Sequence, residues 1–125
     1  MRNRYIPVLF AAFLTVTTTF GQSSKNQVTM YGEVIDIVSY VANGMKPDNA
    51  DRKAVAEASA KAGNPLGILE RGTNKVYVVT MNQPNTSAIS TLQPYFGLRI
   101  FALGKVYKRG GIQLFMLSDI GKSVK

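Results

Sequence analysis

The side chains that could do chemistry in this 125-residue chain are few, because it contains no histidine and no cysteine. This removes the residue types that most often act as general base, thiolate nucleophile or zinc ligand. The serines therefore lack a histidine base, and no motif spacing supports a Ser–Lys dyad. The seven remaining carboxylates are Glu33, Asp36, Asp48, Asp51, Glu57, Glu70 and Asp119.

Two of these carboxylates lie in the first predicted strand. Glu33 and Asp36 are three residues apart in an expected strand, so they face opposite sides and cannot act as a pair. Asp36 lies in an apolar stretch, where we expect a hydrogen bond to a loop or to a basic side chain. We therefore predict a non-enzymatic protein with no catalytic residues, no cofactor and no bound metal.

The elements that must position these residues are mostly strands. A long β-type segment is predicted over 28–41, and Gly32 inside it indicates a bulge or bend where a side chain would crowd the backbone. Further strands are expected over 66–70, 75–81, 98–107 and 112–120. The turns 71–74 and 109–111 make hairpins of the second and third strands and of the fourth and fifth.

Two helices are predicted between the strands. Asp48 or Asn49 can cap a helix that runs to about Lys61, and Gly63 and Pro65 end it. Its expected apolar stripe consists of Ala54, Val55, Ala58 and Ala62. A second, short helix is expected after Thr86 or Ser87, with Pro94 near its end.

This order of elements predicts a mostly-β fold. Five strands, a bent first strand and a helix between the third and fourth strands are typical of the OB-fold, a small Greek-key barrel. The helix over 49–61 is then an insertion between strands one and two, at a loop that borders the usual binding face. The alternative is an open α+β sheet made of the same elements.

The first 21 residues predict export. Arg2 and Arg4 precede a short apolar run, and Thr19-Phe20-Gly21 offers small residues for cleavage before Gln22. We expect a signal peptide over 1–21, a polar lead over 22–27, one domain over 28–120 and a basic tail over 121–125. The protein would be periplasmic or extracellular, with no stable membrane span after cleavage, since the apolar run is too short to cross a bilayer.

The charge of the chain is moderately positive. After loss of Arg2 and Arg4, 13 basic residues stand against 7 acidic ones. Such a surplus has two interpretations. It favours an anionic partner, or it only keeps the protein soluble. The partner is expected to be an anionic ligand or another exported protein.

Several segments resemble a family of small exported bacterial proteins with an OB-like barrel. They are Gly32 to Asp36, Ser39-Tyr40, Ala56-Glu57, Ala62 to Leu69, Gly104 to Tyr107 and Gly110-Gly111. The resemblance implies four metal ligands, a cysteine before the tyrosine and then a histidine and two cysteines on the inserted helix. Those positions here are Ser39, Arg52, Val55 and Ser59. None of these side chains suits zinc or copper, so the implied metal site does not carry over.

Two interpretations of the altered positions are open. In the first, the helix is held only by Val55 and alanine packing. In the second, Ser39, Arg52 and Ser59 line a small polar pocket for an anion. Tyr40 beside Ser39 completes this set of candidates.

The function predicted from sequence is an exported, non-enzymatic OB-like binding or interaction module. The alternative is a periplasmic oligonucleotide- or polysaccharide-binding protein, because OB-folds bind single strands with aromatic platforms beside basic residues. Tyr77 is a candidate platform for such a ligand. Other strand aromatics near basic residues are Tyr31, Phe101 and Tyr107, although each of them could equally be a packing residue.

Overall fold

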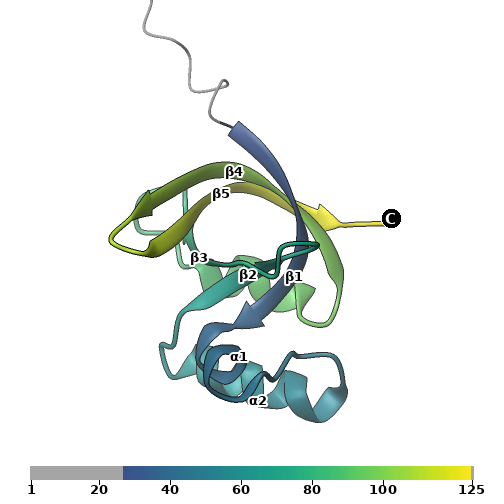
Figure 1. The fold of residues 1–125 in the computed structure, drawn as a ribbon. Coiled ribbons are helices and arrows are strands. Elements are labelled where there is room, and N and C mark those ends of the chain that lie inside the picture. Colours follow the sequence, from purple (N-terminus) through teal and green to yellow (C-terminus); the bar gives the residue numbers. More distant parts are fainter. Residues whose placement is uncertain (1–26, 125) are drawn as a thin grey trace, which may run out of the picture.

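The computed structural model describes residues 27–124, and these form a closed five-stranded barrel (Figure 1). The strand order around the barrel is β1-β2-β3-β5-β4, with β3 and β5 parallel and the other pairs antiparallel. The predicted OB-like barrel is therefore confirmed, and the open sheet is not formed. The strands are β1 (Gln27–Asp36), β2 (Leu66–Glu70), β3 (Val76–Met81), β4 (Arg99–Arg109) and β5 (Ile112–Lys122).

Strand β1 closes the barrel because it pairs with two neighbours. Its first part, from Gln27 to Glu33, pairs with β4, and its second part, from Gly32 to Asp36, pairs with β2. A Cβ atom at Gly32 would lie 2.1 Å from the carbonyl oxygen of Leu69. The expectation that a side chain at Gly32 would crowd the backbone is thus confirmed.

The segment after Asp36 is a helix, and the prediction of a strand as far as Val41 was wrong. Helix α1 (Ile37–Asn43) begins where the Asp36 carboxylate accepts a hydrogen bond from the backbone N–H of Ser39. It ends at Gly44, which has φ 65°. The cap and the left-handed glycine outweigh the β-branched residues between them, whose preference for strands is weak.

Helix α2 (Ala50–Lys61) is confirmed, but the prediction of its buried face was wrong. Asn49 caps it by accepting a hydrogen bond of 2.9 Å from the backbone N–H of Arg52. Ala56 and Ala60 are buried in the barrel core, whereas Val55 is half exposed. Alanines occur all round this helix, so the pattern alone does not decide which face packs.

The core fills the barrel and is sealed by helices. Phe115, Ile100 and Leu117 are fully or almost fully buried within it. Helix α3 (Ala88–Leu92), capped by Ser87 and followed by the 3-10 turn η2 (Gln93–Tyr95), adds Leu92 to the core. Helices α1 and α2 lie together at one end of the barrel, below β1 and β2 in Figure 1. Among the described residues, no helix has the length and apolar character needed to cross a bilayer.

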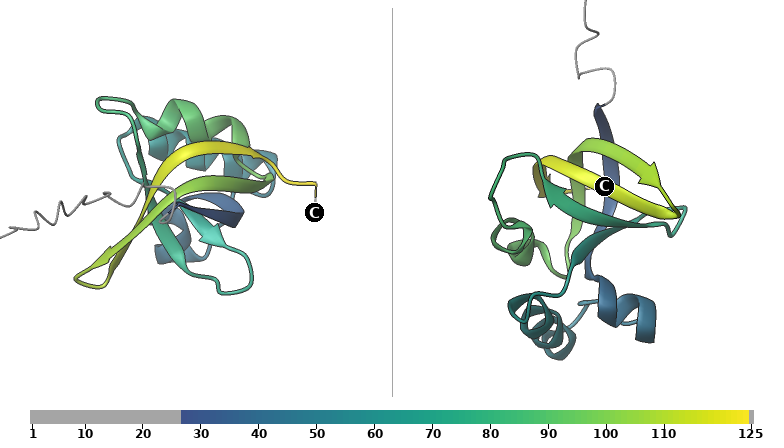
Figure 2. Two further views of the ribbon diagram at one scale, coloured as in Figure 1. Left: turned by 90° about the horizontal axis from the view of Figure 1, so that it is seen from above. Right: turned by 90° about the vertical axis from the view of Figure 1, so that its left-hand side faces the viewer.

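The β4–β5 hairpin, residues 99–122, forms part of the barrel wall, and its tip stands clear of the rest in Figure 1 and in the left view of Figure 2. Gly110 and Gly111 form the turn, both with positive φ. Strand β5 extends to Lys122, so two residues of the expected tail are paired in the sheet. The predicted signal peptide over 1–21 and nearly all of the polar lead lie outside the described residues.

Candidate functional site

Ser39 and Tyr40 lie in α1, next to the barrel. Ser39 is buried, and its hydroxyl donates a hydrogen bond to Oδ2 of Asp36. Tyr40 is half-buried and its backbone carbonyl accepts from Gly44 N at 2.7 Å. The hydroxyl of Ser39 thus serves the start of the helix, and the hydrogen bond expected of Asp36 goes to its own helix rather than to a basic residue.

Arg52 and Ser59 lie in α2 and have separate partners. Arg52 is exposed and its Nη1 lies 3.1 Å from Oδ1 of Asp48, one turn away. The hydroxyl of Ser59 accepts a hydrogen bond of 2.9 Å from Nδ2 of Asn64. The surface has one hollow beside Lys46 and Arg99 and a smaller one beside Pro47 and Gly97. Neither hollow is lined by Ser39, Arg52 or Ser59. The structure therefore does not bring these three candidates together around either of them.

Tyr77 lies on β3 with its side chain in the barrel core, where the residue is 4% exposed. Its ring is therefore not available as a surface platform for stacking. Burial raises the pKa of the Tyr77 phenol above its ordinary value, and the nearby Glu70 carboxylate adds to the rise. Both causes act because they disfavour the phenolate.

The raised pKa of Tyr77 predicts a loss of stability in alkali. The stability is fully present below about pH 10, where the unfolded phenol ionises, and it is lost as the pH rises towards the higher folded pKa. We expect the free energy of unfolding to fall more between about pH 9 and about pH 11 in the natural protein than in Tyr77→Phe. Urea unfolding at the two pH values measures this. An equal fall in both proteins would contradict it.

The larger surface hollow, of about 100 Å³, lies where four segments meet. Strand β1 contributes Glu33, the loop between α1 and α2 contributes Lys46, and the start of β4 contributes Arg99. Leu69 on β2 is almost fully buried and forms an apolar part of the wall. The remaining lining residues are Gly32, Glu70, Arg71, Gly72 and Asn74.

An ion pair separates this hollow from a smaller one. Nζ of Lys46 lies 3.5 Å from Oε2 of Glu33, and the two side chains are 40% and 38% exposed. Both residues also line the second hollow, of about 50 Å³, together with Pro47 and Gly97. The Glu33–Lys46 pair is thus a wall shared by the two hollows.

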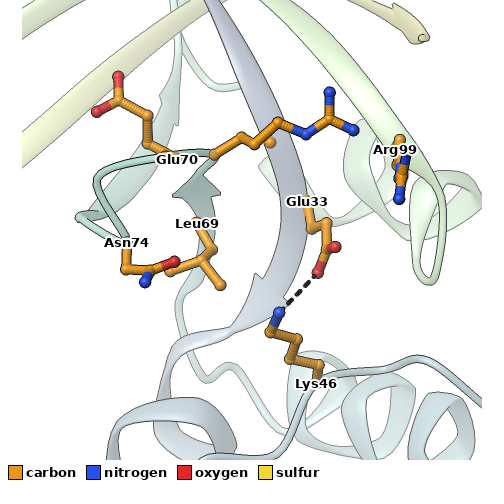
Figure 3. A pocket seen from close by; sticks show the side chains of 9 residues that line it. Glu33, Lys46, Leu69, Glu70, Asn74 and Arg99 are labelled. Carbon is orange, nitrogen blue, oxygen red and sulfur yellow. Dashed lines mark ion pairs between the residues drawn. The ribbon is translucent and has the colours of Figure 1, made fainter. Parts of the chain in front are cut away.

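The two carboxylates around the larger hollow do not act as a pair. In Figure 3 the Glu33 carboxylate points toward Lys46, whereas the Glu70 carboxylate turns away from it. Oε1 of Glu70 accepts a hydrogen bond from the hydroxyl of Thr73 in the adjacent turn. Arg99 is the direct cross-strand neighbour of Glu33 on β4. Glu33 therefore lies between two basic residues, and this corner of the hollow has a surplus of positive charge.

A second feature is the outer face of β4, where every other residue points away from the core. Ile100, Ala102 and Gly104 are buried on the inner face. We call the outward set the β4 stripe. It consists of Arg99, Phe101, Leu103, Lys105, Tyr107 and Arg109. Basic and aromatic residues recur along it, and at roughly 3.3 Å per residue it is about 33 Å long.

The aromatic residues of the β4 stripe are partly accessible. Tyr107 is 48% exposed, as is Tyr31, which faces Phe101 across the β1–β4 pair. The Phe101 ring lies over Gly121 on β5, where a Cβ atom would come within 2.5 Å of it. Of the aromatics noted in the sequence, Tyr31, Phe101 and Tyr107 therefore share one outer surface, and only Tyr77 faces the core.

The net positive charge of the described residues lies on the same hairpin. Residues 99–122 carry five basic residues and one acidic residue, whereas the rest of 27–98 and 123–124 carries six of each. The hairpin therefore supplies the entire positive surplus of the described residues. This asymmetry was not apparent from the total charge, because it depends on which segments form one arm of the fold.

Within residues 27–124 no three acidic side chains come close enough together to hold a metal ion. Comparison of the chain with protein-family models, curated proteins and solved structures finds no significant match. The hollow and the β4 stripe are the two candidate sites among the described residues.

Proposed function

We propose that the protein is an exported, non-enzymatic OB-like binding module that holds an anionic polymer along the β4 stripe. The observation that carries this proposal is the length of the stripe together with its charge. A surface about 33 Å long, with basic residues at both ends and near its middle, suits an extended ligand better than a small molecule. The narrower alternative is an oligonucleotide, favoured by the half-exposed Tyr107 and Tyr31, on which bases can stack.

Salt-dependent binding tests the electrostatic part of the proposal. We expect the protein to bind heparin and a single-stranded oligonucleotide with affinity that falls steeply as salt rises. The double variant Lys105→Gln, Arg109→Gln removes two stripe charges. It should reduce the slope of log affinity against log salt by about 1.4 on the oligonucleotide, at roughly 0.7 per lost phosphate contact.

The control is a double variant with the same loss of charge elsewhere. Lys61→Gln with Lys75→Gln changes two exposed residues, one at the end of α2 and one beside the β2–β3 turn. It should leave the slope nearly unchanged. If both double variants weaken binding equally, the interaction reflects net charge alone and the proposal is wrong.

Substitution of Tyr107 separates the two ligand classes. Loss of a stacked base costs about 1–3 kcal/mol, so Tyr107→Ala should weaken oligonucleotide binding by roughly 5- to 150-fold. Heparin binding should change far less if its sulfates contact mainly the basic residues. A weak effect on the oligonucleotide would leave polysaccharide as the ligand class.

A further inference from the structure

We propose that the larger hollow is a second binding site, which takes a small oxyanion group, a carboxylate or a phosphate, between Lys46 and Arg99. This site shares Arg99 with the β4 stripe, but its ligand is a single charged group rather than a polymer. Glu33 already places a carboxylate there, 3.5 Å from Nζ of Lys46. The hollow thus contains an internal oxyanion whose position an external one would take.

The charges around the hollow suit a small anionic group. Lys46 and Arg99 lie on either side of one carboxylate, that of Glu33, since Glu70 turns away to Thr73 (Figure 3). Among the described residues, no carboxylate lies within 4.0 Å of the Arg99 side chain. Its guanidinium can therefore donate hydrogen bonds to a bound ligand. A guanidinium binds a carboxylate or phosphate with two parallel hydrogen bonds, which favours this ligand class.

The Glu33–Lys46 pair is exchangeable. Both side chains are well over a third exposed, and exposed ion pairs contribute little to stability, so an external oxyanion can replace Glu33 at small cost. The smaller hollow on the other side of the pair gives the displaced Glu33 side chain a place to move. The larger hollow has a volume of about 100 Å³, which fits a small group and not a whole polymer.

The test uses substitutions that should act in opposite directions. Binding of inorganic phosphate and of acetate is followed by NMR titration at constant ionic strength, with Gly32, Gly72 and Asn74 amides as reporters at the hollow. Glu33→Gln removes the competing charge and should strengthen binding about tenfold, whereas Lys46→Gln should weaken it about tenfold. Comparison of phosphate with acetate identifies which oxyanion the hollow prefers.

A change on the stripe supplies the control. Lys105→Gln should leave oxyanion binding unchanged, and Lys46→Gln should leave polymer binding unchanged, so the two proposals fail or succeed separately. Weaker or unchanged binding in Glu33→Gln would overturn the present proposal, as would the absence of shifts at the hollow in both the natural protein and Glu33→Gln. The dispersion of the NMR spectrum verifies that each variant is folded.

Discussion

Gly32→Ala is expected to destabilise the barrel by about 3 kcal/mol or more, at the upper end of what overpacking costs. The new Cβ atom would lie 2.1 Å from the carbonyl oxygen of Leu69 and 3.2 Å from a methyl group of Ile68. The first contact is with backbone that is paired in the β1–β2 ladder, so relief requires a shift of one strand. Urea unfolding, with the midpoint and slope compared to those of the natural protein, measures the loss.

The matched control is Gly110→Ala in the β4–β5 turn. Gly110 has φ 60°, and nothing lies within 4 Å of a Cβ atom there. Its cost is that of a left-handed alanine, about 1–2 kcal/mol. A loss for Gly32→Ala no larger than that for Gly110→Ala would show that β1 and β2 can separate without penalty, and that the close approach does not hold the barrel in shape.

The fold could be predicted from sequence because its signals are local. Gly32 marked a bulge or bend in the first strand, and the 71–74 and 109–111 turns marked two hairpins. Asn49 and Gly63 fixed the ends of α2. Each of these residues acts within a few positions of itself, through a cap, a turn or a close backbone approach. The order of elements then left few topologies.

Helix α1 was missed because its apolar residues have the composition of a strand. Ile37, Val38 and Val41 are β-branched, and tertiary context decides such cases more than propensity does. The available signal was Asp36, an N-cap residue, followed eight positions later by Gly44, a left-handed C-terminal residue. That pair brackets a short helix.

The candidate sites could be predicted only in part. The basic and aromatic members of the β4 stripe occupy every second position of one strand. Their shared face therefore follows from the two-residue period of a strand. The hollow depends on Glu33, Lys46 and Arg99, which come from three distant segments. These residues lie close together only because the α1–α2 insertion folds back on β1. Nothing in the spacing of these three residues indicates that contact.

Asp36→Ala is expected to cost about 2–4 kcal/mol, because it removes the cap of α1 and leaves the buried Ser39 without its acceptor. The Asp36 residue is 1% exposed, and its Oδ2 accepts from the Ser39 backbone N–H at 3.3 Å and from the Ser39 hydroxyl. The backbone N–H of Ile37 donates a hydrogen bond of 3.2 Å to the carbonyl oxygen of Pro65, which connects the start of α1 to the residue before β2. Urea unfolding gives the total loss.

The conservative variant Asp36→Asn separates the cap from the charge. Its side-chain oxygen can still accept from Ser39, and its amide would replace Oδ1, for which no partner is found within residues 27–124. We therefore expect Asp36→Asn to cost less than about 1 kcal/mol, since asparagine caps helices as well as aspartate does. Amide hydrogen exchange should show the effect of Asp36→Ala chiefly in residues 37–43, with β4 changed only by the global loss of stability. Equal losses in Asp36→Asn and Asp36→Ala would show that the carboxylate charge, and not the geometry of the cap, holds the helix against the barrel.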